Sequence, residues 1–313
     1  MTARVLTFEQ GMLPLGPAVA AIGVFDGVHL GHQALVRTCR ERAAQEGASS
    51  IVVTFDRDPD RVVAPDRAAP QLLELDDKVA ALAELGVDWI VVVPFDAGVA
   101  SMSPERFVDE VLLTACTPVA VVVGQDFRFG RAASGDVAAL AALGAERSFS
   151  VEPQPLVHAD GAPVTSTRVR SLVATGDVAA AARLLGRPHR LRGSVTRGRG
   201  VGARLGAPTA NLRTHGYAAV PASGVYAAWA HLGSQRMPAA VSVGAPPTFP
   251  DVHDGVEVHL LDYDGPDLYG HEMAVDFVDR LRGLAKFEDE TELADAIARD
   301  VARVRTVLGE QPR

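Results

Sequence analysis

The sequence predicts an α/β open parallel sheet followed by a small antiparallel β-barrel with a C-terminal helix. In the first half, short apolar segments alternate with helix-forming segments, the order of a parallel sheet covered by helices on both faces. After residue 187, short apolar segments separated by Gly, Pro and Asp follow one another, and no helical pattern occurs before residue 290. The length of 313 residues favours two domains, which we place at 1–186 and 187–313.

Four buried strands are expected in the first half, because four short runs consist almost entirely of apolar residues; they cover residues 18–25, 50–55, 89–95 and 119–124. Helices are expected between and after them, beginning after Gly31 and Ser103 and covering 76–85 and 136–143. Ligands of such sheets bind beyond the carboxyl ends of the strands. We therefore expect the functional residues of this half in the loops that follow the strands.

The second half begins after a short helix at 176–186, which ends in a glycine. Five strands are expected, because short apolar or alternating runs lie between turn residues; they cover 190–196, 224–232, 239–243, 256–261 and 272–281. A helix at 290–308 closes this half. Such a run of short strands favours a small antiparallel barrel.

Composition excludes several classes of function. The net charge of −9, from 30 basic and 39 acidic residues, argues against a nucleic-acid partner. No apolar run approaches the roughly 20 residues of a membrane span. Cys39 and Cys116 match no metal spacing, and the first residues show no signal-peptide pattern. We therefore expect a cytoplasmic protein without a membrane partner, either a monomer or a homo-oligomer.

The turn after the first long apolar strand, GVFDGVHLGH at residues 23–32, carries the strongest chemical signal. Gly27 and Gly31 permit positive φ and close backbone approach. His29 and His32 fall at a helix start, where free amides and the helix dipole favour phosphate. A histidine there is more often a surface residue or a cap. Two histidines inside a glycine turn after an apolar strand favour phosphate contact.

This segment resembles the His-x-Gly-His signature of the nucleotidylyltransferase superfamily. Its Phe-Asp-Gly flank is similar to the FAD synthetase module of bacterial bifunctional riboflavin kinase/FAD synthetases. Two further blocks resemble that module, GQDFRFGR at 124–131 and TSTRVRSL at 165–172. From physics alone, the aromatic residues of the first block either stack on a planar ring or staple their own loop. In the second block, Ser166 or Thr167 either caps a helix or helps to clamp a triphosphate.

The resemblance implies roles for particular residues of the first half. His29 and His32 are the implied catalytic residues. The implied ATP-binding residues are Gly23, Phe25, Asp26, Gly31, Asp126, Ser166, Thr167, Arg168 and Arg170. The implied flavin-binding residues are Phe127, Phe129 and Arg131.

The second half carries its own candidate site. The glycine-rich stretch at 198–206 can cradle phosphate with its amides or serve as a solvated linker. The following PTAN, at 208–211, offers oxygen ligands for Mg²⁺ in Thr209 and Asn211, although Pro and Asn are also common in turns. In the predicted strand VEVHLL at 256–261, Glu257 and His259 share one face.

PTAN and this strand resemble the riboflavin kinase family. The resemblance implies that Glu257 is the general base and that Thr209 and Asn211 hold the metal. The residues implied to bind the phosphates of ATP are Gly198, Gly202, Arg204, Gly206 and Pro208.

Together these resemblances extend in order along nearly the whole chain. They imply that the barrel phosphorylates riboflavin to FMN, with ATP as co-substrate and Mg²⁺ as cofactor. They also imply that the α/β half joins AMP from a second ATP to FMN, giving FAD and pyrophosphate. FMN would attack the α-phosphorus directly while His29 and His32 stabilise the transition state.

Four positions depart from the family pattern. Asp58 stands where a histidine is usual, Ala203 replaces an arginine, Ala207 replaces a phenylalanine, and Ser242 stands where asparagine is common. Two alternatives therefore stay open: a divergent paralogue with one half inactive or acting on a modified flavin or another nucleotide, and a non-catalytic flavin- or nucleotide-binding regulator. The residues whose presence favours the enzyme are His29, His32, Thr209, Asn211 and Glu257.

Overall fold

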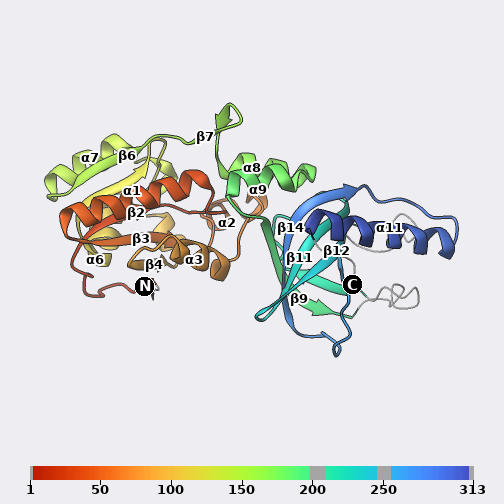
Figure 1. The fold of residues 1–313 in the computed structure, drawn as a ribbon. Helices are drawn as coiled ribbons and strands as arrows, with labels where there is room; N and C mark the ends of the chain where they lie inside the picture. The colour runs from red at the N-terminus through yellow and green to blue at the C-terminus, as the bar shows by residue number, and fades with distance from the viewer. Residues whose placement is uncertain (1–2, 198–208, 245–254, 310–313) are drawn as a thin grey trace. The chain divides into compact units, whose positions relative to one another are not determined.

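The computed structural model describes residues 3–197, 209–244 and 255–309 (Figure 1). The chain divides into two compact units, Met1–Thr165 and Ser166–Arg313. Helices α8 (Ser166–Thr175) and α9 (Val178–Leu185) therefore belong to the second unit, whereas the sequence-based division places them in the first. The limits of the two catalytic domains at 186 and 187 stay a prediction.

Six parallel strands form the main sheet of the first unit, in the order β1-β4-β3-β2-β5-β6. They are β1 (Arg4–Thr7), β2 (Pro17–Ile22), β3 (Ser49–Phe55), β4 (Trp89–Val93), β5 (Thr117–Gly124) and β6 (Ser150–Gln154). The four predicted strands are β2 to β5, and the edge strands β1 and β6 were not predicted. The first predicted strand is too long, because β2 ends at Ile22 and the glycine turn begins at once.

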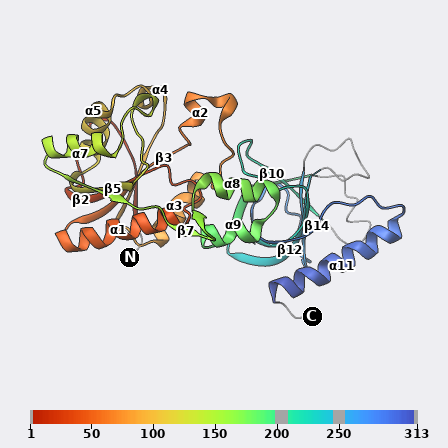
Figure 2. The same cartoon turned by 90° about the horizontal axis from the view of Figure 1, so that it is seen from above.

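Helices cover both faces of this sheet, as predicted. One face packs on α1 (Leu30–Glu46) and α3 (Leu75–Glu84). The other packs on α5 (Pro104–Phe107), the π-helical turn η2 (Val108–Leu112), α6 (Leu113–Ala115) and α7 (Val137–Glu146). Figure 2 shows α1 on one side of the strands and α5 and α7 on the other.

The remaining elements of the first unit are short. They are α2 (Asp60–Val63), α4 (Ala97–Ala100), the 3-10 turns η1 (Pro65–Arg67) and η3 (Arg131–Ala133), and the hairpin β7 (His158–Ala159) with β8 (Ala162–Pro163). Cys39 and Cys116 are buried free thiols, and burial raises the pKa of each to about 12.

The strand order brings two of the candidate functional loops to neighbouring positions at one edge of the sheet. From β2 the chain proceeds through β3 and β4 on one side of the sheet, whereas β5 and β6 lie on its other side. The carboxyl ends of β2 and β5 are therefore neighbours at the point where the strand order reverses. Open α/β sheets bind ligands at this point. The His29–His32 turn and the 124–131 loop leave the sheet here.

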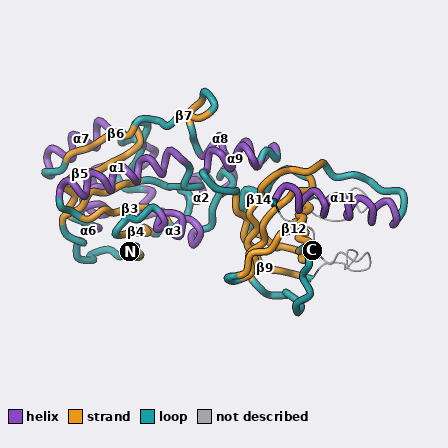
Figure 3. The backbone as a smooth tube through the Cα atoms, in the orientation of Figure 1, coloured by secondary structure: helices purple, strands orange, loops and turns teal. Residues whose placement is uncertain are grey.

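The second unit is built on a closed antiparallel barrel with the strand order β10-β13-β12-β11-β14-β9. Its strands are β9 (His189–Thr196), β10 (Ala210–Thr214), β11 (Gly224–Leu232), β12 (Gln235–Val243), β13 (Val256–Leu260) and β14 (Glu272–Arg282). Five strands were predicted, and the strand that was missed is β10. It begins within the PTAN segment, which was interpreted as a turn or a ligand site. In the described part of this unit, no helix interrupts the strands before α11 (Glu290–Leu308) (Figure 3).

Alternation along the strands separates the inside of the barrel from its outside. Val256, Val258 and Leu260 of β13 are buried in the barrel core, whereas Glu257 and His259 are half-buried on the other face. This confirms that Glu257 and His259 share a face. Helix α11 covers another part of the outer face, where Val304 packs with apolar residues of β11 and β14. Among the described residues, no helix is long and apolar enough to cross a membrane.

Candidate active sites

His29 and His32 lie together at the first turn of α1, as predicted. His29 is the N-cap, and its Nδ1 accepts a hydrogen bond of 3.3 Å from the backbone N–H of His32. The two imidazole rings stack with centroids 3.7 Å apart and planes 15° apart. His29 is only 5% exposed. The sequence therefore places two imidazoles, in one fixed arrangement, at the positive end of a 17-residue helix.

The turn that carries the histidines is held in an unusual conformation. Phe25 and Val28 have φ of 55° and 40°, values that bulky side chains rarely adopt. Such residues cost roughly 1–3 kcal/mol each and cluster at functional sites. Phe25 is buried and meets the ring of His32 edge-on at 5.2 Å. A Cβ at Gly31 would lie 3.0 Å from the His29 ring, so a larger residue there would press on that ring.

The buried carboxylate of Asp26 stabilises this turn through hydrogen bonds to a neighbouring segment. Its carboxylate is 4% exposed and accepts hydrogen bonds of 3.0 Å and 3.2 Å from the backbone N–H groups of Leu72 and Leu73. These contacts tie the turn after β2 to the segment that leads into α3. Contact of Asp26 with ATP stays a prediction, as do the ATP contacts of Gly23, Phe25 and Gly31.

The structure supports one of the two alternatives that the sequence left open for the loop after β5, the staple within the loop. The rings of Phe127 and Phe129 stack with centroids 5.5 Å apart. Phe129 is 7% exposed and belongs to the core, where it packs on Phe107. Phe127 is only partly buried, and Arg131 is exposed. Phe129 thus staples the loop and supports the ring of Phe127. Flavin contacts of Phe127, Phe129 and Arg131 stay predictions, as does ATP binding by Asp126.

The loop after β3, next to β2, contains the departure at Asp58. Its Oδ1 accepts a hydrogen bond of 3.1 Å from the backbone N–H of Asp60 at the start of α2. Arg57 pairs with Asp56 at 2.7 Å, and Arg61 donates to Gln71. Asp58 therefore has a local structural role as a turn-capping carboxylate.

Ser166, Thr167, Arg168 and Arg170 lie in the first turns of α8. The helix begins at Ser166, so Thr165 stands at the N-cap position, and the expected cap by Ser166 or Thr167 is wrong. Val169 between the two arginines is buried, Thr167 is exposed, and Arg168 is half-buried. Contact of this helix with a triphosphate stays a prediction.

Four polar residues form a row across the outer face of the barrel. In the strand register, Asn211 stands opposite both Thr196 and Glu257, and Glu257 stands opposite Ser242. All four side chains are half-buried. Residues directly opposite in a sheet share a face, with Cβ atoms about 4.5–5.5 Å apart. The structure therefore brings Asn211 and Glu257 together. Ser242, a departure from the family, is the other neighbour of Glu257.

The barrel row offers hard oxygen donors, the kind that Mg²⁺ prefers. They are the amide of Asn211 and the carboxylate of Glu257, with the hydroxyl of Thr209 just before β10. Within the described ranges, no group of three or more His, Cys, Asp or Glu side chains could hold a metal. Seven residues of interest lie outside the described part of the chain: Gly198, Gly202, Ala203, Arg204, Gly206, Ala207 and Pro208.

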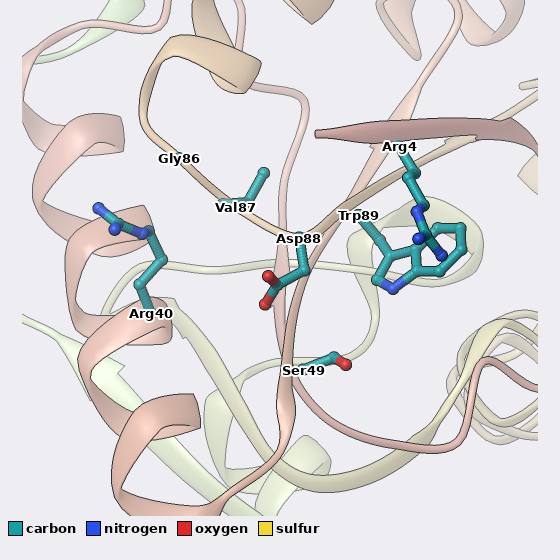
Figure 4. Close-up of a pocket in the computed structure, with 7 residues that line it drawn as sticks. All are labelled: Arg4, Arg40, Ser49, Gly86, Val87, Asp88 and Trp89. Atoms are coloured by element: carbon teal, nitrogen blue, oxygen red, sulfur yellow. The ribbon is translucent and has the colours of Figure 1, made fainter. Parts of the chain in front are cut away.

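A hollow of about 700 Å³ lies at the opposite, amino end of the parallel sheet (Figure 4). It is lined by Arg4, Arg40, Ser49, Gly86, Val87, Asp88 and Trp89. The guanidinium of Arg4 lies 5.0 Å from the centroid of the Trp89 ring, and Asp88 accepts hydrogen bonds from Ser50. This hollow contains none of the predicted site residues. The candidate chemistry therefore belongs to the carboxyl end of the sheet and to the barrel row.

Comparison with known proteins matches both units. The FAD synthetase family model matches residues 14–168, and the riboflavin kinase model matches residues 185–308. A bifunctional riboflavin kinase/FMN adenylyltransferase from Pseudomonas fluorescens is 39% identical over 290 residues, covering 92% of each chain. The protein of that name from Escherichia coli K12 is 34% identical over 297 residues, covering 95% of this chain and 94% of its own.

A solved structure has a similar fold over nearly all of the chain's length. It is described as a macrolide-efflux protein from Streptococcus pneumoniae, with a TM-score of 0.84 and 28% sequence identity. The alignment covers 96% of this chain and 98% of that one. The predicted order of an open parallel sheet, a barrel and a final helix is confirmed.

Proposed function

The chain belongs to the bifunctional riboflavin kinase/FMN adenylyltransferase family, and we propose how its residues divide the two reactions. It phosphorylates riboflavin to FMN and adenylylates FMN to FAD. The adenylyltransferase model matches the α/β half, and the kinase model matches the barrel half. We assign adenylyl transfer to His29 and His32, and phosphoryl transfer to Glu257.

In adenylyl transfer, a phosphate oxygen of FMN attacks the α-phosphorus of ATP. A bond forms between that oxygen and phosphorus, and the bond to the pyrophosphate oxygen breaks. Negative charge grows on the pyrophosphate, and we propose that His29 and His32 donate hydrogen bonds to it. Their stacked arrangement at the helix N-terminus supports this role, because the donors need little rearrangement during the reaction.

In phosphoryl transfer, the terminal ribityl hydroxyl of riboflavin attacks the γ-phosphorus of ATP. We propose that the Glu257 carboxylate accepts the hydroxyl proton as the new O–P bond forms and ADP leaves. Mg²⁺, when bound with ATP, offsets the charge of the phosphates. Thr209 and Asn211 would hold that ion, and the register opposition of Asn211 and Glu257 supports a shared site.

One observation carries this proposal: the catalytic residues implied for each reaction lie within a single unit. The stacked histidines are in the first unit and the Asn211–Glu257 pair is in the second. A non-catalytic regulator would not need a strained turn that fixes two imidazoles. The substrates and the composition support a cytoplasmic location for the enzyme.

The purified protein is expected to convert riboflavin to FMN and then to FAD when it is incubated with ATP and Mg²⁺. Separation of the flavins by chromatography over time measures both steps. An excess of EDTA should stop both reactions, because ATP would lose its divalent ion, and added Mg²⁺ should restore them.

Each alternative predicts a different product pattern. FMN without FAD would indicate an inactive α/β half, and conversion of FMN but not riboflavin would indicate an inactive barrel. Riboflavin or FMN that binds and remains unchanged would favour the regulator. Products that form equally well in excess EDTA would contradict the proposed role of Mg²⁺.

A further inference from the structure

Lys78 is a buried cation beneath the turn that carries the two histidines. It lies in α3, and only 2% of its surface is exposed. Its ammonium group donates hydrogen bonds of 2.6 Å to the carbonyl of Phe55 and 3.2 Å to the carbonyl of Val24. Phe55 ends β3, and Val24 follows β2. One ammonium group therefore ties together the carboxyl ends of two neighbouring strands.

The Val24 carbonyl lies at the start of this turn and accepts hydrogen bonds from two side chains. Besides the ammonium group of Lys78, the hydroxyl of Thr54 donates to it, at 3.1 Å. The next residue is Phe25, the first of the two strained positions, and its ring contacts His32. A turn that is strained keeps its shape only when its surroundings hold it. Hydrogen bonds from Lys78 and Thr54 hold the turn at the carbonyl of Val24, just before its first strained residue.

The burial of a charged side chain at Lys78 calls for a physical explanation. A buried lysine is costly unless it is paired, and an apolar side chain of similar volume often gives equal or greater stability. Three carboxylates from the surrounding turns attract this ammonium: Asp26 after β2, and Asp56 and Asp58 after β3. Burial nevertheless lowers the pKa of Lys78 from 10.5 to about 8. At neutral pH the side chain is therefore a cation, among three anions at an edge proposed to bind phosphates.

We propose that Lys78 is a positioning residue for adenylyl transfer, which fixes the carbonyls of Val24 and Phe55 so that the turn presents His29 and His32 correctly. This inference rests on the proposed function. Without the ammonium group, two carbonyls would lose a donor, and three carboxylates would lose their shared countercharge. The strained turn would then relax, and the imidazoles would move from the leaving pyrophosphate.

The test is Lys78→Met, which removes the charge and keeps most of the volume. We expect kcat for FMN adenylylation to fall about 100-fold, the typical effect of a displacement of about 1 Å at reacting groups. The KM for FMN should change little, and phosphorylation of riboflavin by the same chain should continue. Lys78→Arg, which keeps the charge and donors, should recover part of the rate. Glu84→Gln, which removes an exposed charge from the same helix, is the matched control and should behave as wild type.

The pH profile separates positioning from simple stabilisation. As the pH rises through about 8, Lys78 loses its proton and FAD formation by wild type should fall. The free energy of unfolding should instead rise between pH 8 and 10.5, because the unfolded state then binds more protons at this residue than the folded state. Lys78→Met should show neither trend.

Three results would overturn the inference. They are wild-type kcat in a folded Lys78→Met variant, an equal loss of kcat in Glu84→Gln, and FAD formation by wild type that stays constant above pH 8. Should Lys78→Met fail to fold, the wild-type pH profile and the Lys78→Arg variant decide between the same outcomes. A wild-type enzyme that makes no FAD from FMN would instead contradict the proposed function, before any variant is compared.

Discussion

Replacement of His32 by alanine is expected to stop FAD formation while FMN formation continues. His32 stacks on His29 and packs against Phe25 at the start of α1. Loss of one donor to developing phosphate charge typically lowers kcat by about 100- to 1,000-fold. The measurement is the rate of FAD formation from FMN and ATP, with riboflavin phosphorylation recorded on the same preparation.

Two controls make the His32→Ala result specific. Arg37→Ala changes an exposed cation in the same helix and should leave both rates as in wild type. His32→Gln keeps a side-chain N–H donor and should recover part of the lost rate. Equal loss of both reactions in His32→Ala would show that the two reactions do not have separate sites.

Replacement of Glu257 by glutamine is expected to produce the complementary defect. Glutamine occupies nearly the same space in β13 but cannot accept the hydroxyl proton. Loss of a general base lowers the rate by about 100- to 10,000-fold. Phosphorylation of riboflavin should fall by this factor, whereas FMN supplied directly should still become FAD. Both rates are measured by chromatographic separation of the flavins.

The matched control for Glu257→Gln is Glu272→Gln, which makes the same change at an exposed position at the start of β14. It should phosphorylate riboflavin at the wild-type rate. Glu257 is an ordinary outward-facing carboxylate if its replacement has as little effect as the control. The assignment of the general base to this strand would then be wrong.

The sequence predicted the inner part of the parallel sheet because strands buried on both faces are continuous apolar runs. The edge strands β1 and β6 are mostly exposed and contain Arg4, Glu152 and Pro153, so they lack that signal. Strand β10 was missed for another reason. Its first residues belong to PTAN, whose Pro and Asn are typical of a turn, and closure of the barrel overrides that local preference.

The histidine site could be predicted because an apolar strand, a glycine turn and a helix start are local patterns. The barrel row could be predicted only in part, because opposition of Asn211 to Glu257 depends on strand register. Lys78 was missed because lysine is usually exposed. A signal was present, since Lys78 lies four residues before Leu82 and therefore on the same buried face of α3.

The central claim is that the two reactions use separate sites, each on its own unit, and a mixing experiment tests it most directly. Equal amounts of His32→Ala and Glu257→Gln are combined with riboflavin, ATP and Mg²⁺. We expect the first variant alone to stop at FMN, the second alone to leave riboflavin unchanged, and the mixture to produce FAD. A mixture that accumulates no FAD, although the second variant converts added FMN, would contradict the account.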